Sequence, residues 1–285
     1  MLCKPDYPVD PVTTEILRNV DEIASAMGLS YFVAGAMARD LVLTHVFGIS
    51  IGRATRDVDF GIAVADWAQF RQIKEALEAT GLFVASDRSE HRLQFRVAPG
   101  THGVPVDLIP FAGVEEENRT IRWPPGMHEV MSVAGFEDAR RSAVTIQVNP
   151  NLKVPVASLP GLAILKLFAW LDRGHENAKD ALDLLAVVRN YAVAGQTDRL
   201  YGEDSAVMEQ AAYELDVAGA ILLGRDAARI ATPETLAQLT SALAQPAIID
   251  RLITHAARGV TWADEVDRFA VANKLIQAFR AGLTD

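Results

Sequence analysis

Apolar residues follow two periods in the first part of the chain, and only one of them continues into the second part. Before Pro160, short apolar runs typical of strands lie between stretches with helical spacing, and after it the spacing is almost entirely helical. This order predicts an α+β fold, a mixed sheet with flanking helices followed by a helical C-terminal region. We expect residues 1–157 and residues 158–285 to form two domains.

Strands are predicted where short β-branched or aromatic runs end at a glycine, a proline or a polar turn. Residues 31–34, for example, are apolar throughout and are followed by Gly35. Helices are predicted where apolar residues recur every three or four positions. In the first domain the predicted strands are residues 31–34, 58–64, 82–85, 93–97, 104–110, 144–148 and 154–157, and the predicted helices are residues 16–27, 36–47 and 67–79.

Residues 112–141 show no regular period and are expected to form loops. This stretch holds the acidic run Glu115–Glu117 and the turn-forming sequence Trp123-Pro124-Pro125-Gly126. The second domain is expected to be helical throughout. Its predicted helices are residues 162–172, 178–190, 206–223, 233–244 and 263–282.

Net charge and composition limit the classes of protein to which this chain can belong. The 285 residues include 37 Asp and Glu against 27 Lys and Arg, a net charge of −10 that excludes a broad basic coat for DNA. A local basic patch remains possible within that total. The single cysteine, Cys3, has no partner for an internal disulfide, and charged residues interrupt every apolar stretch before about 18 residues. We therefore expect a cytoplasmic protein with no membrane partner.

Two aspartates in the sequence Arg53 to Gly61 are the first candidates for chemistry. Because successive strand residues point to opposite faces, Asp57 and Asp59 share one side while Val58 and Phe60 face the core. Two carboxylates on one side repel each other unless a divalent cation lies between them, and Mg²⁺ prefers such oxygen ligands. The alternative is an exposed edge strand with two ordinary aspartates.

Asp107 favours the metal interpretation. It lies in a run that is otherwise apolar on both faces, where a carboxylate is costly unless it is paired or bound to metal. If this strand lies beside the strand of Asp57 and Asp59, the three carboxylates converge and could hold two metal ions. The alternative for Asp107 is a salt bridge with Arg92 or Arg96 on the neighbouring hairpin strand.

A glycine turn precedes these aspartates. The strand that ends at Ala34 passes through Gly35 and Ala36 into a predicted helix, which leaves free backbone N–H groups where phosphate oxygens can bind. A turn of this kind is common, so its significance comes from the order of the features. The order is a phosphate-binding turn, a pair of aspartates and then a third aspartate on a later strand.

The helical part contributes a second group of candidates. Lys166 lies on a largely apolar predicted helix, and at steps of four and three it shares a face with Trp170 and Arg173. Lys166 could reach a triphosphate there and Trp170 could offer a stacking surface, or the lysine could simply snorkel from a packed helix. Asp180 could orient Lys166 or be an ordinary helix N-terminal carboxylate. Asp183 is interpreted as the partner of Lys179 in a surface pair.

Arginines cluster in the sequence around the predicted phosphate-binding turn and in the hairpin region that follows it. Arg39, Arg53 and Arg56 surround the glycine turn in the sequence, and another three arginines occupy the following hairpin region. Their guanidinium groups could neutralise phosphate charge on a nucleotide or on RNA, or could pair with the more numerous carboxylates. The three in the hairpin region are Arg88, Arg92 and Arg96.

The strings GAMARDLVL and TRDVDFGI together resemble the catalytic core of the DNA polymerase β-like nucleotidyltransferases. The resemblance is greatest to the AbiEii-type enzymes of bacterial toxin–antitoxin and phage-defence systems, and it covers roughly residues 30–190. It implies Mg²⁺, or Mn²⁺, at three carboxylates, a nucleotide at the glycine turn, and a later catalytic lysine and aspartate. The implied residues are Asp57, Asp59 and Asp107 for metal and catalysis, Lys166 and Asp180 for catalysis, and Gly35, Ala36, Arg39, Arg56 and Lys166 for the nucleotide.

The same resemblance implies a reaction and partners. Residues 1–157 would be the catalytic domain, to whose cleft residues 158–285 contribute, and the enzyme would move an NMP from an NTP to a hydroxyl. The acceptor it suggests is a tRNA 3′ end, with a cognate antitoxin as partner. The turn departs from the family pattern because Ala36 stands where many members have a serine hydroxyl or a second glycine. The alternatives are transfer to a protein or small-molecule hydroxyl, or a non-catalytic protein that binds a nucleotide or a partner.

Overall fold

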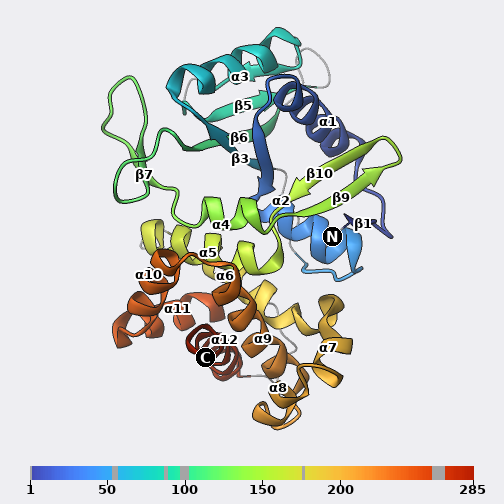
Figure 1. Ribbon diagram of the computed structural model, residues 1–285, viewed down its shortest axis with the longest axis vertical. Helices are drawn as coiled ribbons and strands as arrows, with labels where there is room; N and C mark the ends of the chain where they lie inside the picture. The colour runs from blue at the N-terminus through green and yellow to red at the C-terminus, as the bar shows by residue number, and fades with distance from the viewer. Residues whose placement is uncertain (1, 53–56, 87–88, 97–102, 175–176, 259–266) are drawn as a thin grey trace. The chain divides into compact units, whose positions relative to one another are not determined.

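The computed structural model describes residues 2–52, 57–86, 89–96, 103–174, 177–258 and 267–285. The chain divides into two compact units, residues 1–158 and residues 159–285 (Figure 1). The first unit is built on a mixed sheet with flanking helices, and the second is helical throughout its described residues. The predicted α+β fold class is therefore confirmed.

An eight-stranded sheet forms the centre of the first unit, with the strand order β1-β9-β10-β2-β3-β6-β5-β4. Three neighbouring pairs run parallel, β1 with β9, β10 with β2 and β3 with β6, and the others run antiparallel. The bounds are β1 Leu2–Cys3, β2 Ser30–Ala34, β3 Val58–Val64, β4 Phe83–Ala85, β5 Arg92–Phe95, β6 Val104–Ala112, β9 Val144–Asn149 and β10 Leu152–Val156.

Successive residues of β2 meet helices on opposite faces of this sheet. Tyr31 packs against Phe60 and donates a hydrogen bond to Asp21 of α1 at 2.7 Å. Phe32, the next residue, contacts Phe136 of α4 edge to face. The sheet is thus covered by helices on both faces, as expected when strands are apolar on both sides. The helices of this unit are α1 Pro11–Ala26, α2 Gly35–Asp40, the π-helical segment η1 Leu41–Val46, α3 Trp67–Ala79 and α4 Phe136–Arg141.

Residues 112–141 differ from the predicted loop. They contain β7 Thr120–Arg122 and β8 Val130–Ser132, which form a separate two-stranded sheet, and the whole of α4. Only Ile121 of β7 is buried, so these short strands carry no alternating apolar pattern that the sequence could reveal. The helix α4 begins after Gly135 at a φ of 81°, and its sequence FEDARR is mostly charged.

The second unit contains nine helical segments among its described residues. One prediction is wrong here, because residues 206–223 form two helices. Ala212 and Tyr213 adopt left-handed φ angles of 50° and 64° between them, and alanine gives no sequence signal for such a break. The bounds are α5 Leu159–Arg173, α6 Lys179–Asn190, η2 Ala192–Gln196, α7 Thr197–Tyr201, α8 Ser205–Gln210, α9 Leu215–Ile230, α10 Pro233–Leu243, α11 Pro246–Ala257 and α12 Arg268–Thr284.

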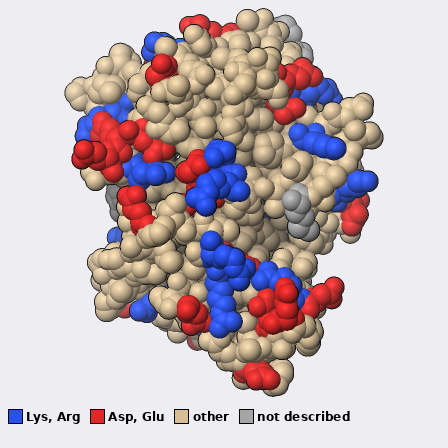
Figure 2. All heavy atoms as spheres, viewed as in Figure 1, with Lys and Arg blue, Asp and Glu red and all other residues tan. Residues whose placement is uncertain are grey.

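The charged side chains on the surface are of both signs, as the composition predicts. Acidic and basic side chains are interspersed on the face seen in Figure 2, and no broad basic surface covers it. Within the described ranges, no helix combines the length and the apolar character needed to cross a membrane.

Glycines bring the backbones of α9 and α12 close together. A Cβ added at Gly224 would lie 2.2 Å from the carbonyl oxygen of Phe279, and one added at Gly282 would lie 2.0 Å from that of Ile221. Real Cβ atoms do not approach backbone so closely. The two helices can pack at this distance only because both positions lack a side chain.

We predict that Gly224→Ala lowers the free energy of unfolding by about 1–3 kcal/mol because the new methyl group overpacks this contact. Helix propensity alone predicts the opposite, a gain of about 1 kcal/mol, so the sign decides between the two effects. Urea unfolding measures it, with Ser241→Ala at an exposed helical position of α10 as the control, expected to stay within about 0.5 kcal/mol. A Gly224→Ala protein more stable than the wild type would contradict the packing argument.

Candidate functional site

The strand of Asp57 and Asp59 lies inside the sheet. Asp57 immediately precedes β3, Asp59 is its second residue, and β3 is flanked by β2 and β6. The alternative of an exposed edge strand is therefore wrong. Val58 and Phe60 are fully buried, as the alternation of strand residues predicts.

Gly35 lies directly against Asp59. Ala34 is the register partner of Asp59 on β2, and Gly35 follows with a φ of 63° that favours glycine. A Cβ added at Gly35 would lie 1.7 Å from Oδ2 of Asp59 and 2.6 Å from its Cγ. No other residue fits this turn while the Asp59 carboxylate keeps its place. The turn and the aspartate therefore form one local structure.

Asp107 lies beside Asp59. The two are register partners on the parallel strands β3 and β6, so the predicted adjacency of these strands is confirmed. Asp107 is 8% exposed, and its carboxylate receives two hydrogen bonds from Arg92. These run from Nε to Oδ1 and from Nη2 to Oδ2, both at 2.7 Å. The salt bridge considered from the sequence thus forms with Arg92, while Arg96 lies at the other end of β5.

Arg92 is electrostatically coupled to all three carboxylates. The hydrogen bonds to Asp107 raise the pKa of the guanidinium most, and partial burial opposes them. The negative charges of Asp107, Asp57 and Asp59 raise that pKa further. Arg92 is therefore a permanent cation within the field of three carboxylates, and its single charge offsets one of theirs.

The oxygen ligands that Asp59 and Asp107 offer suit a divalent cation, although the three carboxylates are not grouped around one point. In the part of the chain that the structure describes, no three His, Cys, Asp or Glu side chains are grouped so as to hold a metal ion. Asp59 and Asp107 occupy neighbouring strands about 4.8 Å apart, and both offer the oxygen ligands that Mg²⁺ prefers. Metal binding by Asp57, Asp59 and Asp107 stays a prediction that this chemistry supports.

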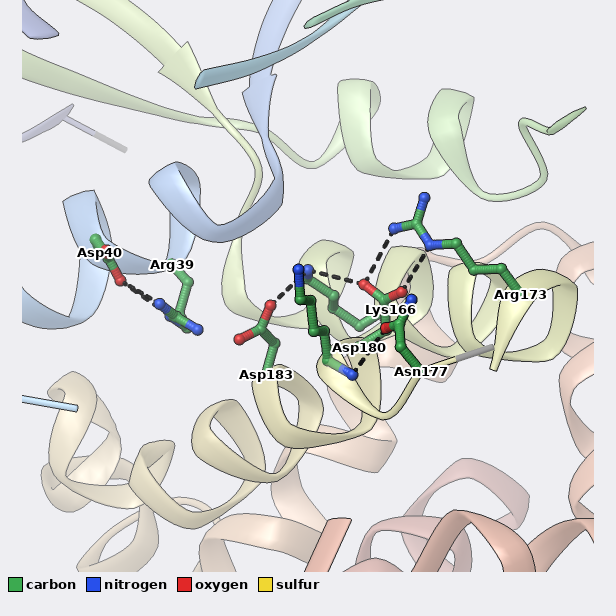
Figure 3. Close-up of polar contacts among 8 residues, drawn as sticks. Arg39, Asp40, Lys166, Arg173, Asn177, Asp180 and Asp183 are labelled. Carbon is green, nitrogen blue, oxygen red and sulfur yellow. Dashed lines mark hydrogen bonds and ion pairs between the residues drawn. The ribbon is translucent and has the colours of Figure 1, made fainter. Parts of the chain in front are cut away.

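Only some of the remaining candidate arginines lie within the described residues. Arg39 is buried on α2, and its Nε and Nη2 donate to Oδ1 of Asp40 at 2.9 and 2.8 Å (Figure 3). Arg53, Arg56 and Arg88 lie outside the described residues. The roles expected of these side chains toward phosphate remain predictions.

In the helical unit, Lys166 forms ion pairs with two aspartates. Its Nζ lies 2.7 Å from Oδ2 of Asp183 and 3.1 Å from Oδ1 of Asp180, so α5 and α6 are joined by these contacts (Figure 3). Burial lowers the pKa of the ammonium, but the charges of Asp183 and Asp180 outweigh it and raise that pKa overall. Lys166 is therefore a buried cation rather than a lysine that snorkels to solvent.

Arg173 holds the other side of Asp180. Its Nε donates to Oδ2 at 2.9 Å and its Nη2 donates to Oδ1 at 3.3 Å. Burial raises the pKa of Asp180, but Lys166 and Arg173 outweigh it and lower that pKa overall. Asp180 thus stays ionised between two cations, which fits the interpretation that it orients Lys166.

Asp183 is the site residue that the sequence interpretation missed. The predicted surface pair with Lys179 is wrong, because Asp183 is only 5% exposed and contacts Lys166 instead. Lys179 is exposed, and its backbone N–H donates to Asn177. The sequence did contain a signal, since Asp180 and Asp183 are three residues apart and so share one face of α6.

The stacking surface predicted at Trp170 is also wrong. Trp170 is fully buried, and its Nε1 donates to Nδ1 of His255 on α11 at 3.2 Å. The guanidinium of Arg251 lies 4.8 Å from the ring centre. Although Trp170 follows Lys166 by one helical turn, its ring is already in contact with α11.

We predict that Asp183→Ala lowers the free energy of unfolding by about 3 kcal/mol, because it leaves the buried Lys166 with one carboxylate fewer. Lys179→Ala is the matched control, since a surface pair between Lys179 and Asp183 would make the two substitutions equivalent. We expect the control to stay within about 0.5 kcal/mol of the wild type. Urea unfolding at neutral pH measures both, and equal effects would contradict the buried arrangement.

Comparison with known proteins places these residues in a family. The model of the family "Nucleotidyl transferase AbiEii toxin, Type IV TA system" matches residues 25–252, which include every candidate residue described above. The search of curated proteins found no match.

Solved structures of low sequence identity are also similar to the chain. An antigenic nucleotidyltransferase-like protein from Paracoccidioides brasiliensis shares 16% identity at a TM-score of 0.42, over 64% of this chain and 77% of that chain. The antibiotic-resistance factor ANT(2'')-Ia shares 10% identity at a TM-score of 0.37, over 72% of this chain and 99% of that chain. A CCA-adding enzyme shares 11% identity at a TM-score of 0.33, over 97% of this chain and 82% of that chain.

The family match spans well over half of the chain and agrees with the resemblance of the glycine turn and the aspartate strand. The chain therefore belongs to the AbiEii nucleotidyl transferase toxin family of type IV toxin–antitoxin systems and is a nucleotidyltransferase.

Proposed function

We propose that the protein transfers an NMP from an NTP to a hydroxyl acceptor in a metal-dependent reaction. The observation that carries this proposal is the side-by-side position of Asp59 and Asp107, with the Gly35 turn against Asp59. Asp57, Asp59 and Asp107 are the residues that would hold Mg²⁺ or Mn²⁺. The metal would stabilise the negative charge that develops on the phosphate oxygens.

The side chains have separate roles in this proposal. Asp107 accepts the proton of the acceptor hydroxyl, whose oxygen forms a bond to the α-phosphorus while the bond to pyrophosphate breaks. Backbone N–H groups at Gly35 and Ala36 bind phosphate oxygens, so the missing hydroxyl at Ala36 removes one donor and not the binding turn. The positive side chains of Arg39, Arg56 and Lys166 neutralise the triphosphate. Asp180 and Asp183 orient Lys166.

The acceptor in this proposal is a tRNA 3′ end. Its support is the sequence Gly35-Ala36-Met37-Ala38-Arg39-Asp40, which shares part of the GGxxRD pattern of CCA-adding enzymes. The family supports a growth-inhibiting activity held in check by a cognate antitoxin in the cytoplasm. Transfer to a protein or a small-molecule hydroxyl is the other outcome that the same chemistry permits.

We predict that Asp57→Asn/Asp59→Asn lowers label transfer from NTP to total tRNA by about 10²-fold or more, because the two substitutions remove carboxylate ligands. Each of the four NTPs, labelled at the α-phosphate, is incubated with the protein and Mg²⁺. Asp198→Asn, an exposed aspartate of α7, is the control and keeps wild-type transfer. Transfer to no acceptor, with no Mg²⁺-dependent nucleotide binding that the double variant loses, would leave a non-catalytic protein as the better interpretation.

We predict that Gly35→Ala abolishes transfer because its Cβ displaces the Asp59 carboxylate. Gly81→Ala is the matched control, since Gly81 also has a left-handed φ of 75° but an added Cβ there has no neighbour within 4 Å. Both variants lose about 1–2 kcal/mol of stability to backbone strain, and only Gly35→Ala loses activity. Transfer assays and urea unfolding of both variants measure this, and equal activities would remove Gly35 from the site.

A further inference from the structure

The third carboxylate, that of Asp107, is paired with a positively charged side chain of the same chain, Arg92. Both oxygens of Asp107 accept a hydrogen bond from Arg92, in the bidentate geometry that is the strongest between these groups. Arg92 is the register partner of Asp107 on β5, and Asp59 is its register partner on β3. Asp107 therefore has a guanidinium on one neighbouring strand and a carboxylate on the other.

The two side chains of this ion pair differ in how far they can move. The side chain of Asp107 is 11% exposed and short, and its strand is buried along most of its length. The side chain of Arg92 is 34% exposed and long, so it can leave the carboxylate and reach water without burying its charge. If the pair opens, the moving partner is Arg92.

A metal ion at Asp107 would need the oxygens that Arg92 now occupies. A guanidinium and a close divalent cation that share the two oxygens of one carboxylate repel each other, so each weakens the binding of the other. A nucleotide offers Arg92 an equivalent partner, because phosphate oxygens accept the same bidentate hydrogen bonds.

We propose that Arg92 and a divalent cation compete for Asp107, so that Arg92 keeps metal affinity low until a nucleotide draws the guanidinium onto its phosphates. This inference rests on the proposed function, because it concerns the same three carboxylates. It adds an order of events, in which metal is bound completely only when nucleotide is present. It also makes Arg92 a specificity-determining residue for phosphate.

Metal affinity in the absence of nucleotide tests the competition. Mn²⁺ binding to the full chain is measured by electron paramagnetic resonance, and we expect Arg92→Gln to lower the Kd about fivefold to tenfold relative to the wild type. Arg140→Gln is the matched control, since Arg140 makes a similar bidentate pair with Glu137 in the same unit and the net charge changes equally. We expect its Kd to stay within about twofold of the wild type.

The Asp107→Asn background separates competition from general electrostatics. If Arg92 acts by holding Asp107, Arg92→Gln changes the Mn²⁺ Kd in the wild-type background and leaves it unchanged once Asp107 is an asparagine. An equal effect in both backgrounds would overturn the proposal, because the guanidinium would then repel the metal through its charge alone.

Thermal unfolding measures the effect of losing the ion pair between Arg92 and Asp107 itself. Without metal, Arg92→Gln lowers the Tm because it leaves neighbouring carboxylates without this cation, and added Mn²⁺ raises its Tm by more than it raises that of the wild type. If Arg92→Gln does not fold, Arg92→Lys, which keeps the charge but loses the bidentate contact, shows a smaller change in the same direction.

The outcomes distinguish this inference from the function on which it rests. Mn²⁺ binding by the wild type with nucleotide, together with an unchanged Kd in Arg92→Gln without nucleotide, overturns the competition and leaves the proposed function intact. Absence of Mn²⁺ binding by the wild type, with and without nucleotide, overturns both.

Discussion

The in-register parallel pairing of β3 with β6 is the constraint on which the rest of the site depends. This register sets Asp59 beside Asp107, and it also sets Val58 beside Val106 and Phe60 beside Leu108. The four apolar side chains are fully buried. A shift of β6 by one residue would turn Val106 and Leu108 to the carboxylate side and Asp107 into the core, so burial on one face fixes the adjacency of Asp59 and Asp107 on the other.

The strands on either side supply what this pair of carboxylates requires. β2 ends at the level of Asp59 and continues into Gly35, whose missing side chain leaves room for the carboxylate. β5 places Arg92 opposite Asp107 and so adds a positive charge. The site is therefore built by four adjacent strands, and each contributes a different property: space, a carboxylate, a second carboxylate and a cation.

The sequence could predict this carboxylate site because the features that mark its strands and its aspartates are local, or consist of a polar residue in an apolar run. Asp107 stands out as a carboxylate in a run that is apolar on both faces, and β2 and β3 are short runs with clear ends. Periodicity alone could not predict which helix covers which face, and this is why Trp170 and Asp183 were misplaced. The break at Ala212 and Tyr213 was equally hidden, since its cause is backbone conformation in residues that helices accept.

The clusters at Lys166 and at Asp107 both combine aspartates with a basic side chain, but their balance of charge differs. At Lys166, two aspartates surround one buried ammonium, so the carboxylates keep a cation fixed and charged. At Asp107, one arginine lies in the field of three carboxylates, so the cation is the minority and is partly exposed. A cation added there reverses the local sign of an acidic surface. The net charge of −10 is therefore compatible with a polyanionic substrate, provided that the substrate and the cation arrive together.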